Sequence, residues 1–159
     1  MRIYRDRLQN IHEKPVDAPL HWRLSAYGLL ENDKGEWLMV EPAWTTRLDL
    51  PGGGVEIDES MRDAVKRELY EETGYKVEAE EMPIYLGEND FYYDYIDQFQ
   101  HCIILVYRIR LTDEKRDAEV VNTVEGFEIR DMRWVDPKSL TEDQVQPIFW
   151  PLVARMRAL

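Results

Sequence analysis

Three glutamates, Glu68, Glu71 and Glu72, have the residue type and the spacing to act together. They lie in a segment, residues 60–73, whose apolar residues recur with the period of a helix. At 3.6 residues per turn, the carboxylates fall within an arc of about 100° on the same side as that apolar stripe. Carboxylates so placed repel one another, and they lie near the helix end that carries the negative dipole. Something must offset this repulsion.

Two explanations are open for the three acids. The helix end can project into solvent, which is the ordinary explanation of a run of charges. Arg67 can also pair with Glu71 at i, i+4, but one arginine cannot neutralise three carboxylates. A divalent cation can, and hard cations such as Mg²⁺ take oxygen ligands while staying bound to water and to phosphates. The helix therefore indicates a Mg²⁺ site.

A glycine-rich turn, Pro51-Gly52-Gly53-Gly54, precedes this helix. Glycines let the backbone approach a ligand closely, although such a turn alone is a weak signal. Together with the glutamates it predicts a site where the backbone of Gly52 and Gly53 and several carboxylates converge on metal and phosphate. Arg47, shortly before the glycines, is either a contact to phosphate or an ordinary exposed arginine.

The elements that must hold this site follow from periodicity and from turn residues. Strands are expected at 22–30 and 37–40, paired as a hairpin, and at 84–86, 91–95, 101–111 and 127–135. Helices are expected at 60–73, between an N-cap at Ser60 and a C-cap at Gly74, and at 145–159, with a kink at Pro151. The stretch 112–125 reads as a charged loop. The pattern predicts an α/β or α+β domain in which helices cover a mixed sheet.

Length and charge set the wider limits. The chain has 159 residues and a formal net charge of −12, which fits one domain, residues 21–159, preceded by an N-terminal arm, residues 1–20. The acidic balance disfavours binding to long nucleic acids. One cysteine excludes an internal disulfide framework, and we expect a cytoplasmic protein with no signal peptide and no membrane span. Apolar residues of the arm and of the last helix either form a homodimer or fold back on the monomer.

One motif resembles a known family. Gly53, then Glu59, then the run Arg67-Glu68-Leu69-Tyr70-Glu71-Glu72-Thr73-Gly74-Tyr75 resembles the Nudix box, Gx5Ex7REUxEExGU, where U is a bulky apolar residue. Every fixed position is filled, and the last U is the aromatic Tyr75. The resemblance implies an α/β/α sandwich with a mixed sheet. It also implies hydrolysis of a nucleoside diphosphate linked to another moiety, with Mg²⁺ or Mn²⁺ as the cofactor.

The resemblance also implies a role for each matching residue. Glu68, Glu71 and Glu72 would ligate the metal with the backbone carbonyl of Gly53, and Glu59 would support the metal cluster. Arg67 would orient the glutamates by pairing with them. The general base varies within the family, and Glu68, Glu119, Glu125 and Glu128 are all open choices here. Metal would neutralise the pyrophosphate while a carboxylate accepts the proton of the attacking water.

The substrate is not singled out. ADP-ribose, a dinucleoside polyphosphate, a nucleotide sugar and a nucleoside triphosphate all remain open, each releasing a nucleoside monophosphate. Aromatic residues at 91–95 could stack on a base, although most strand aromatics simply pack. The alternative function is a non-catalytic module that binds a nucleotide on the same fold. The complete set of box acids favours the enzyme, since a pure binder has no need of three mutually repelling acids.

Overall fold

The computed structural model describes residues 2–122 and 129–158. Its strands are β1 (Tyr4–Arg5), β2 (Ile11–His12), β3 (Leu20–Leu30), β4 (Trp37–Pro42), β5 (Gly52–Gly54), β6 (Val77–Ala79), β7 (Tyr85–Tyr93), β8 (Gln98–Leu111) and β9 (Ile129–Val135). Its helices are α1 (Met61–Thr73) and α2 (Trp150–Arg157), with short 3-10 turns at Val120–Asn122, Pro137–Ser139 and Glu142–Gln144.

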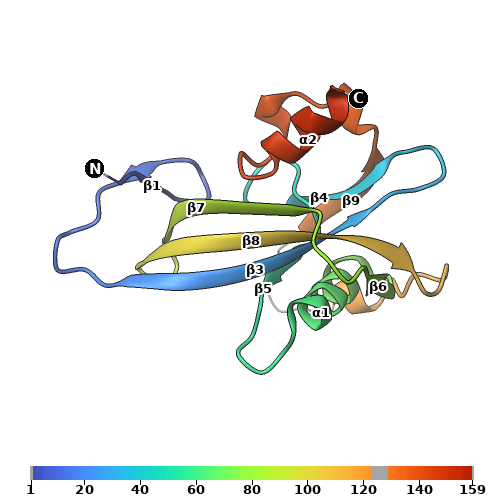
Figure 1. Ribbon diagram of the computed structural model, residues 1–159, viewed down its shortest axis with the longest axis horizontal. Helices are drawn as coiled ribbons and strands as arrows, with labels where there is room; N and C mark the ends of the chain where they lie inside the picture. The colour runs from blue at the N-terminus through green and yellow to red at the C-terminus, as the bar shows by residue number, and fades with distance from the viewer. Residues whose placement is uncertain (1, 123–128, 159) are drawn as a thin grey trace.

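The main sheet is mixed, as expected. Its order is β2-β1-β7-β8-β3-β5, with β6 paired to the far part of β8. The central pair, β3 and β8, runs parallel from Leu20 opposite Phe99 to Leu30 opposite Ile109, whereas β7 and β5 flank it antiparallel. In Figure 1, α2 lies above this sheet and α1 below it, so the α/β/α sandwich is confirmed.

Two hydrophobic cores fill the layers, because side chains alternate along each strand. On β8, Ile104 and Val106 face the α2 side, while Leu105 and Ile109 face α1. The α2 core also takes in the apolar residues near the C-terminus, since Phe149 is only 1% exposed. The last helix therefore folds back on the monomer. Within the described residues, no helix is long and apolar enough to cross a membrane.

Helix α1 forms where its sequence predicts, for local reasons. The Ser60 hydroxyl accepts a hydrogen bond from the backbone N–H of Asp63 at 3.1 Å, which caps the N-terminus. Gly74 ends the helix with φ of 74°, and its N–H donates to Tyr70 O at 2.8 Å. Ala64, Val65 and Leu69 are fully buried against the sheet.

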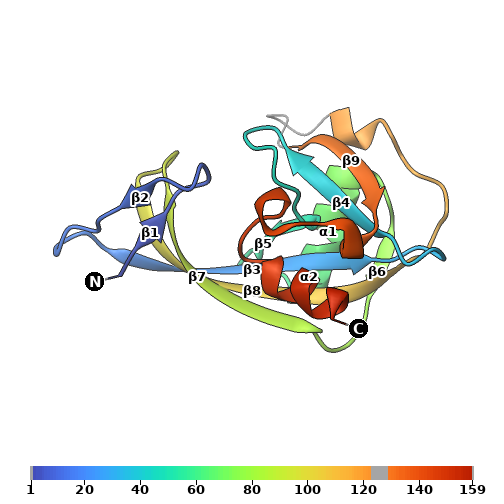
Figure 2. The ribbon, with the colours of Figure 1, turned by 90° about the horizontal axis from the view of Figure 1, so that it is seen from above.

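The predicted hairpin of 22–30 with 37–40 is wrong. Only an isolated bridge joins Glu31 to Trp37, and β4 leaves to pair antiparallel with β9, as Figure 2 shows. The turn itself closes, since the Asn32 N–H donates to Glu36 O at 2.9 Å. Beyond Trp37, however, β4 takes β9 as its partner, while β5 pairs with residues 25–27 of β3.

Two further boundaries differ from expectation. The strands predicted at 84–86 and 91–95 are one strand, β7, because the polar residues between them pair with β8 throughout. The closing helix begins only at Trp150, so Pro151 lies in its first turn, where the missing N–H costs nothing, rather than at a kink. Strand β9 begins at Ile129, while residues 127 and 128 of the predicted strand lie outside the described residues.

Candidate active site

The glycine turn forms a short strand that brings backbone against the acids of α1. Gly52, Gly53 and Gly54 pair with Tyr27, Ala26 and Ser25 of β3, which fixes their position beside the helix. A Cβ on Gly53 would lie 2.7 Å from the Oε1 atom of Glu68, so that only glycine leaves room for this carboxylate. The strand and the helix therefore meet at close range.

The second glutamate at this junction is Glu72. Its Oε2 atom accepts a hydrogen bond from the backbone N–H of Gly52 at 2.8 Å. Gly52 has φ of +146°, and a Cβ there would lie 2.4 Å from the carbonyl oxygen of Ala26. Glu68 and Glu72 both line the large cavity described below, whereas Glu71 does not line it and has a side chain 38% exposed. Glu71 therefore lies outside the cavity wall, and it is joined to Glu68 through Arg67.

Arg67 ties the remaining acids of the motif together. Its guanidinium contacts Glu59 Oε1 at 2.5 Å and Oε2 at 3.1 Å, Glu68 Oε1 at 3.0 Å and Glu71 Oε2 at 3.5 Å. It also donates to the backbone carbonyl of Gly54 at 3.0 Å. The hydrogen bond from Arg67 lowers the pKa of Glu59, and the same bond raises the pKa of Arg67. Arg67 therefore links the glycine strand to three carboxylates.

The donor set at this junction suits a hard cation. Carboxylate oxygens of Glu68 and Glu72 lie beside a strand of glycine carbonyls, and Mg²⁺ prefers oxygen ligands of this kind. Among residues 2–122 and 129–158, however, no three acidic, histidine or cysteine side chains form a complete metal-binding group by themselves. Backbone, water or substrate oxygens would have to complete the shell.

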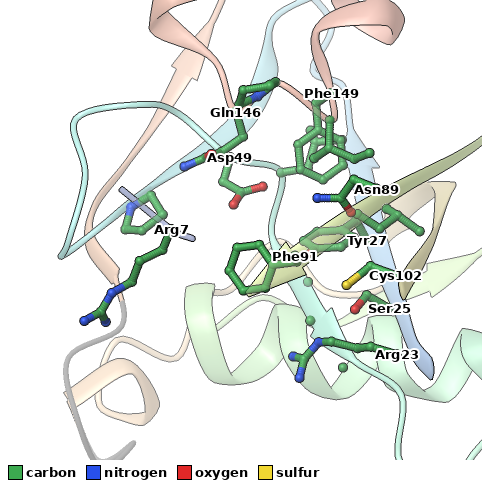
Figure 3. A pocket seen from close by; sticks show the side chains of 18 of the residues that line it. Arg7, Arg23, Ser25, Tyr27, Asp49, Asn89, Phe91, Cys102, Gln146 and Phe149 are labelled. Atoms are coloured by element: carbon green, nitrogen blue, oxygen red, sulfur yellow. The ribbon is translucent and has the colours of Figure 1, made fainter. Parts of the chain in front are cut away.

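A cavity of about 1310 Å³ opens beside the glycine strand (Figure 3). This exceeds the roughly 300–1,000 Å³ typical of small-molecule sites. Aromatic rings line it, among them Phe91, Tyr27 and Phe149, the last two edge to face with centroids 4.9 Å apart. Arg23 lies at the glycine end, where a Cβ on Gly54 would be 3.1 Å from its Nη2 atom.

Besides two atoms of Arg7, three buried polar atoms of the cavity wall have no hydrogen-bond partner in the described structure. They are Asp49 Oδ1, Asn89 Oδ1 and Gln146 Nε2. Burial raises the pKa of the Asp49 carboxyl to about 7. Unpaired buried groups are costly, so these atoms together mark a place where a polar ligand would bind.

Sequence reasoning had missed these three residues. A polar residue flanked by buried apolar neighbours was the available signal, as at Asp49 between Leu48 and Leu50. Gln146, 7% exposed, follows the buried Val145 but precedes the exposed Pro147, so it shows this pattern on one side only. Neither residue could be assigned to a cavity without knowing that residues 49 and 146 approach each other in the fold.

Several predicted residues are placed elsewhere. Arg47 donates to the backbone carbonyls of Glu142 and Val145, at 3.2 and 3.1 Å. It is not among the residues that line the cavity, so the structure does not bring this side chain to the site where a contact to substrate was expected. The reason is that residues 47–49 are held beside the loop before α2. Gly52 and Gly53 do line the cavity.

The four candidates for the general base differ in their position relative to the cavity. Glu68 lines the cavity, whereas Glu119 is exposed on the loop after β8 and does not line it. Glu125 and Glu128 lie outside the described residues. Glu68 is therefore the candidate base that the described structure brings to the cavity.

Fold and motif together define the class, and comparison with known proteins agrees. Residues 21–156 match the NUDIX domain model, so this chain belongs to the NUDIX family. A stretch of 70 residues is 36% identical to a MutT-like protein from Streptomyces ambofaciens. That stretch is 44% of this chain and 45% of the relative, so the match spans less than half the length of that protein.

Solved structures share the fold. The MutT protein from Methanosarcina mazei Go1 superposes with a TM-score of 0.62 at 22% identity, over 91% of this chain and 97% of that one. An ADP-ribose pyrophosphatase from Streptococcus suis 89-1591 gives a TM-score of 0.51 at 16% identity, over 85% of this chain and 92% of the other. At such identities the likeness concerns the fold.

Proposed function

We propose that this chain hydrolyses a pyrophosphate linkage in a nucleoside diphosphate joined to another moiety and releases a nucleoside monophosphate, in a reaction that requires Mg²⁺ or, in its place, Mn²⁺. One observation carries the proposal. Glu72 bonds to the Gly52 N–H at 2.8 Å and Glu68 lies against Gly53, so two acids of the motif meet the glycine strand at the rim of a large cavity.

The residues that would hold the metal are Glu68, Glu71 and Glu72, with the backbone carbonyl of Gly53. When bound, the metal would neutralise the anionic linkage and make its attacking water more acidic. Arg67 keeps Glu68 and Glu71 in place through its ion pairs, and Glu59 in turn holds Arg67. This arrangement fixes the acids before the substrate arrives.

Glu68 is our choice for the group that accepts the proton of the attacking water. It lines the cavity, and the bond from Arg67 Nη1 to its Oε1 atom at 3.0 Å holds the carboxylate in place beside the glycine strand. Glu119 is exposed and lies away from the cavity wall.

The nucleoside would occupy the part of the cavity that holds Asp49, Asn89 and Gln146. Their three unpartnered atoms offer acceptors and a donor to the polar edge of a base, and nearby aromatic rings offer stacking surfaces. The names of the structural neighbours add ADP-ribose to the substrates worth testing first.

The test is a substrate panel with purified protein and Mg²⁺. It contains ADP-ribose, diadenosine polyphosphates, nucleotide sugars and nucleoside triphosphates, and products are separated by chromatography. We expect one class to be cleaved, and Glu72→Gln to lower kcat at least about 100-fold, because the anionic ligand is lost while the amide oxygen can still accept the Gly52 N–H.

The matched control is Glu114→Gln, which removes the same charge from an exposed position outside the cavity and should keep wild-type kcat. Equal activity of wild type and Glu72→Gln would assign the turnover to a contaminant. Tight nucleotide binding without turnover of any compound would instead favour the non-catalytic module.

A further inference from the structure

The N-terminal arm is built into the sheet. Arg5 of β1 pairs in parallel register with Phe91 of β7, and Tyr4 is 2% exposed with its ring edge-on to Phe99 at 5.0 Å. The turn that follows is fixed by Asp6, whose carboxylate accepts the backbone N–H groups of Leu8 and Asn10 at 2.8 and 2.9 Å. The arm thus holds residue 7 in a defined place.

Arg7 lies in that turn with unused hydrogen-bond donors. Its guanidinium carbon is 3.8 Å from the centre of the Tyr95 ring, and Nη2 pairs with Asp94 Oδ2 at 3.1 Å. The side chain is only 18% exposed, and within the described structure the buried Nε and Nη1 atoms have no hydrogen-bond partner. Hydrogen bonding with Tyr95 raises the pKa of Arg7, so the cation is held between Tyr95 and Asp94. An anionic ligand would supply an acceptor for the remaining donors.

The arginines of the cavity occupy two ends of it. Arg23 lies beside the glycine strand, whereas Arg5 and Arg7 come from the arm. The Arg7 guanidinium lies 3.8 Å from the centre of the Tyr95 ring, which is 5.8 Å from the Tyr93 ring, and the Arg23 guanidinium lies 5.7 Å from the Tyr93 ring. The two guanidinium groups are therefore at most about 15 Å apart, on either side of this ring pair. A ligand with its cleaved linkage near Glu68 can then reach Arg7 with an anionic group of its second moiety.

We propose that Arg7, supported by Arg5, binds a phosphate group carried by the second moiety of the substrate, beyond the linkage that is cleaved. The N-terminal arm, which precedes the residues matched by the family model, is then part of the substrate site. This inference rests on the proposed function. Arginine suits the role because its guanidinium stays charged and has donors on several sides, so that Nη1 can bond to a phosphate while Nη2 keeps Asp94.

A pair of ligands that differ by this one group tests the proposal. ADP-ribose and ADP-ribose 1″-phosphate share the linkage and the nucleoside, and only the second carries a phosphate on the distal ribose. Dissociation constants are measured by calorimetry without metal, and KM and kcat with Mg²⁺. We expect wild type to prefer the phosphorylated ligand about tenfold, chiefly through KM.

The variants are Arg7→Gln, Arg7→Lys and the control Arg155→Gln, which removes a charge from the exposed face of α2. The ratio of the two dissociation constants should fall towards one in Arg7→Gln. It should remain in part in Arg7→Lys, which keeps the charge without the planar guanidinium, and it should persist in Arg155→Gln. No preference in wild type would overturn the proposal. Equal weakening of both ligands in Arg7→Gln would overturn it too, because it would show a purely structural role.

The two hypotheses fail in different ways. Turnover of both ligands with equal KM would sink the distal phosphate site and leave the hydrolase intact. A phosphate preference in binding that depends on Arg7, with no turnover of either ligand, would support the site and count against hydrolysis of these compounds.

Discussion

Asp49 shows how burial gives a single side chain a chemistry that its type does not predict. Its Oδ1 atom is buried without a partner, and burial raises the pKa of the carboxyl from 3.8 to about 7. In the folded protein, the neutral acid is therefore favoured across a pH range in which the unfolded chain is already ionised. A protonated Asp49 can donate a hydrogen bond to a ligand as well as accept one.

This shift predicts a pH-dependent stability. The folded state binds the proton more tightly, so the Asp49 contribution is fully present below about pH 4 and is lost as pH rises to about 7, by at most about 4 kcal/mol. The side chain in Asp49→Asn cannot titrate. As pH rises from about 4 to about 7, the free energy of unfolding of the variant should therefore increase relative to that of wild type. Urea unfolding of both proteins at pH 4, 6 and 8 measures the difference, and parallel pH profiles would show that the carboxyl titrates normally.

At the scale of elements, the site is the junction of β5 with α1. The helix was predictable because its signals are local: a cap at Ser60, a glycine at 74 and the box between them. The pairing of β4 with β9 was not, because the two strands are far apart in the sequence and no local signal joins them. The same holds for Gln146 and Asp49, which reach the cavity from separate parts of the chain.

Substitution of two neighbouring glycines of β5 by alanine should affect different properties, stability for one and turnover for the other. A Cβ at Gly52 meets backbone at 2.4 Å under a φ of +146°, so Gly52→Ala should lower the free energy of unfolding by more than about 2 kcal/mol. A Cβ at Gly53 meets only the end of the flexible Glu68 side chain, at 2.7 Å. Gly53→Ala should thus cost less than about 1 kcal/mol of stability but lower kcat at least about tenfold.

Urea unfolding and turnover of both variants, measured side by side, separate the two effects. Wild-type kcat in a folded Gly53→Ala protein would show that the contact between Glu68 and the glycine strand has no part in the reaction.

Over the whole molecule, acidic charge dominates, and the cavity is no exception. The chain carries a net charge of −12, and the cavity wall holds five acids against three arginines: Asp49, Glu68, Glu72, Glu88 and Asp90, and Arg5, Arg7 and Arg23. An anionic substrate would therefore depend on these arginines and on a cation bound at the glutamates to offset the repulsion. The last helix buries its apolar face within the monomer, and a homodimer through the arm, like a cytoplasmic location, stays a prediction from the sequence.

The most direct measurement of the central claim is isotope incorporation during turnover. Wild-type protein is incubated with Mg²⁺ and its best substrate from the panel in water enriched in oxygen-18, and the masses of the products are measured by mass spectrometry. Attack of water on phosphorus predicts one oxygen-18 per bond cleaved, in the phosphate of one product, and a loss of that product in Glu72→Gln. Products without label in either phosphate, or label on a sugar carbon, would contradict hydrolysis of the pyrophosphate linkage.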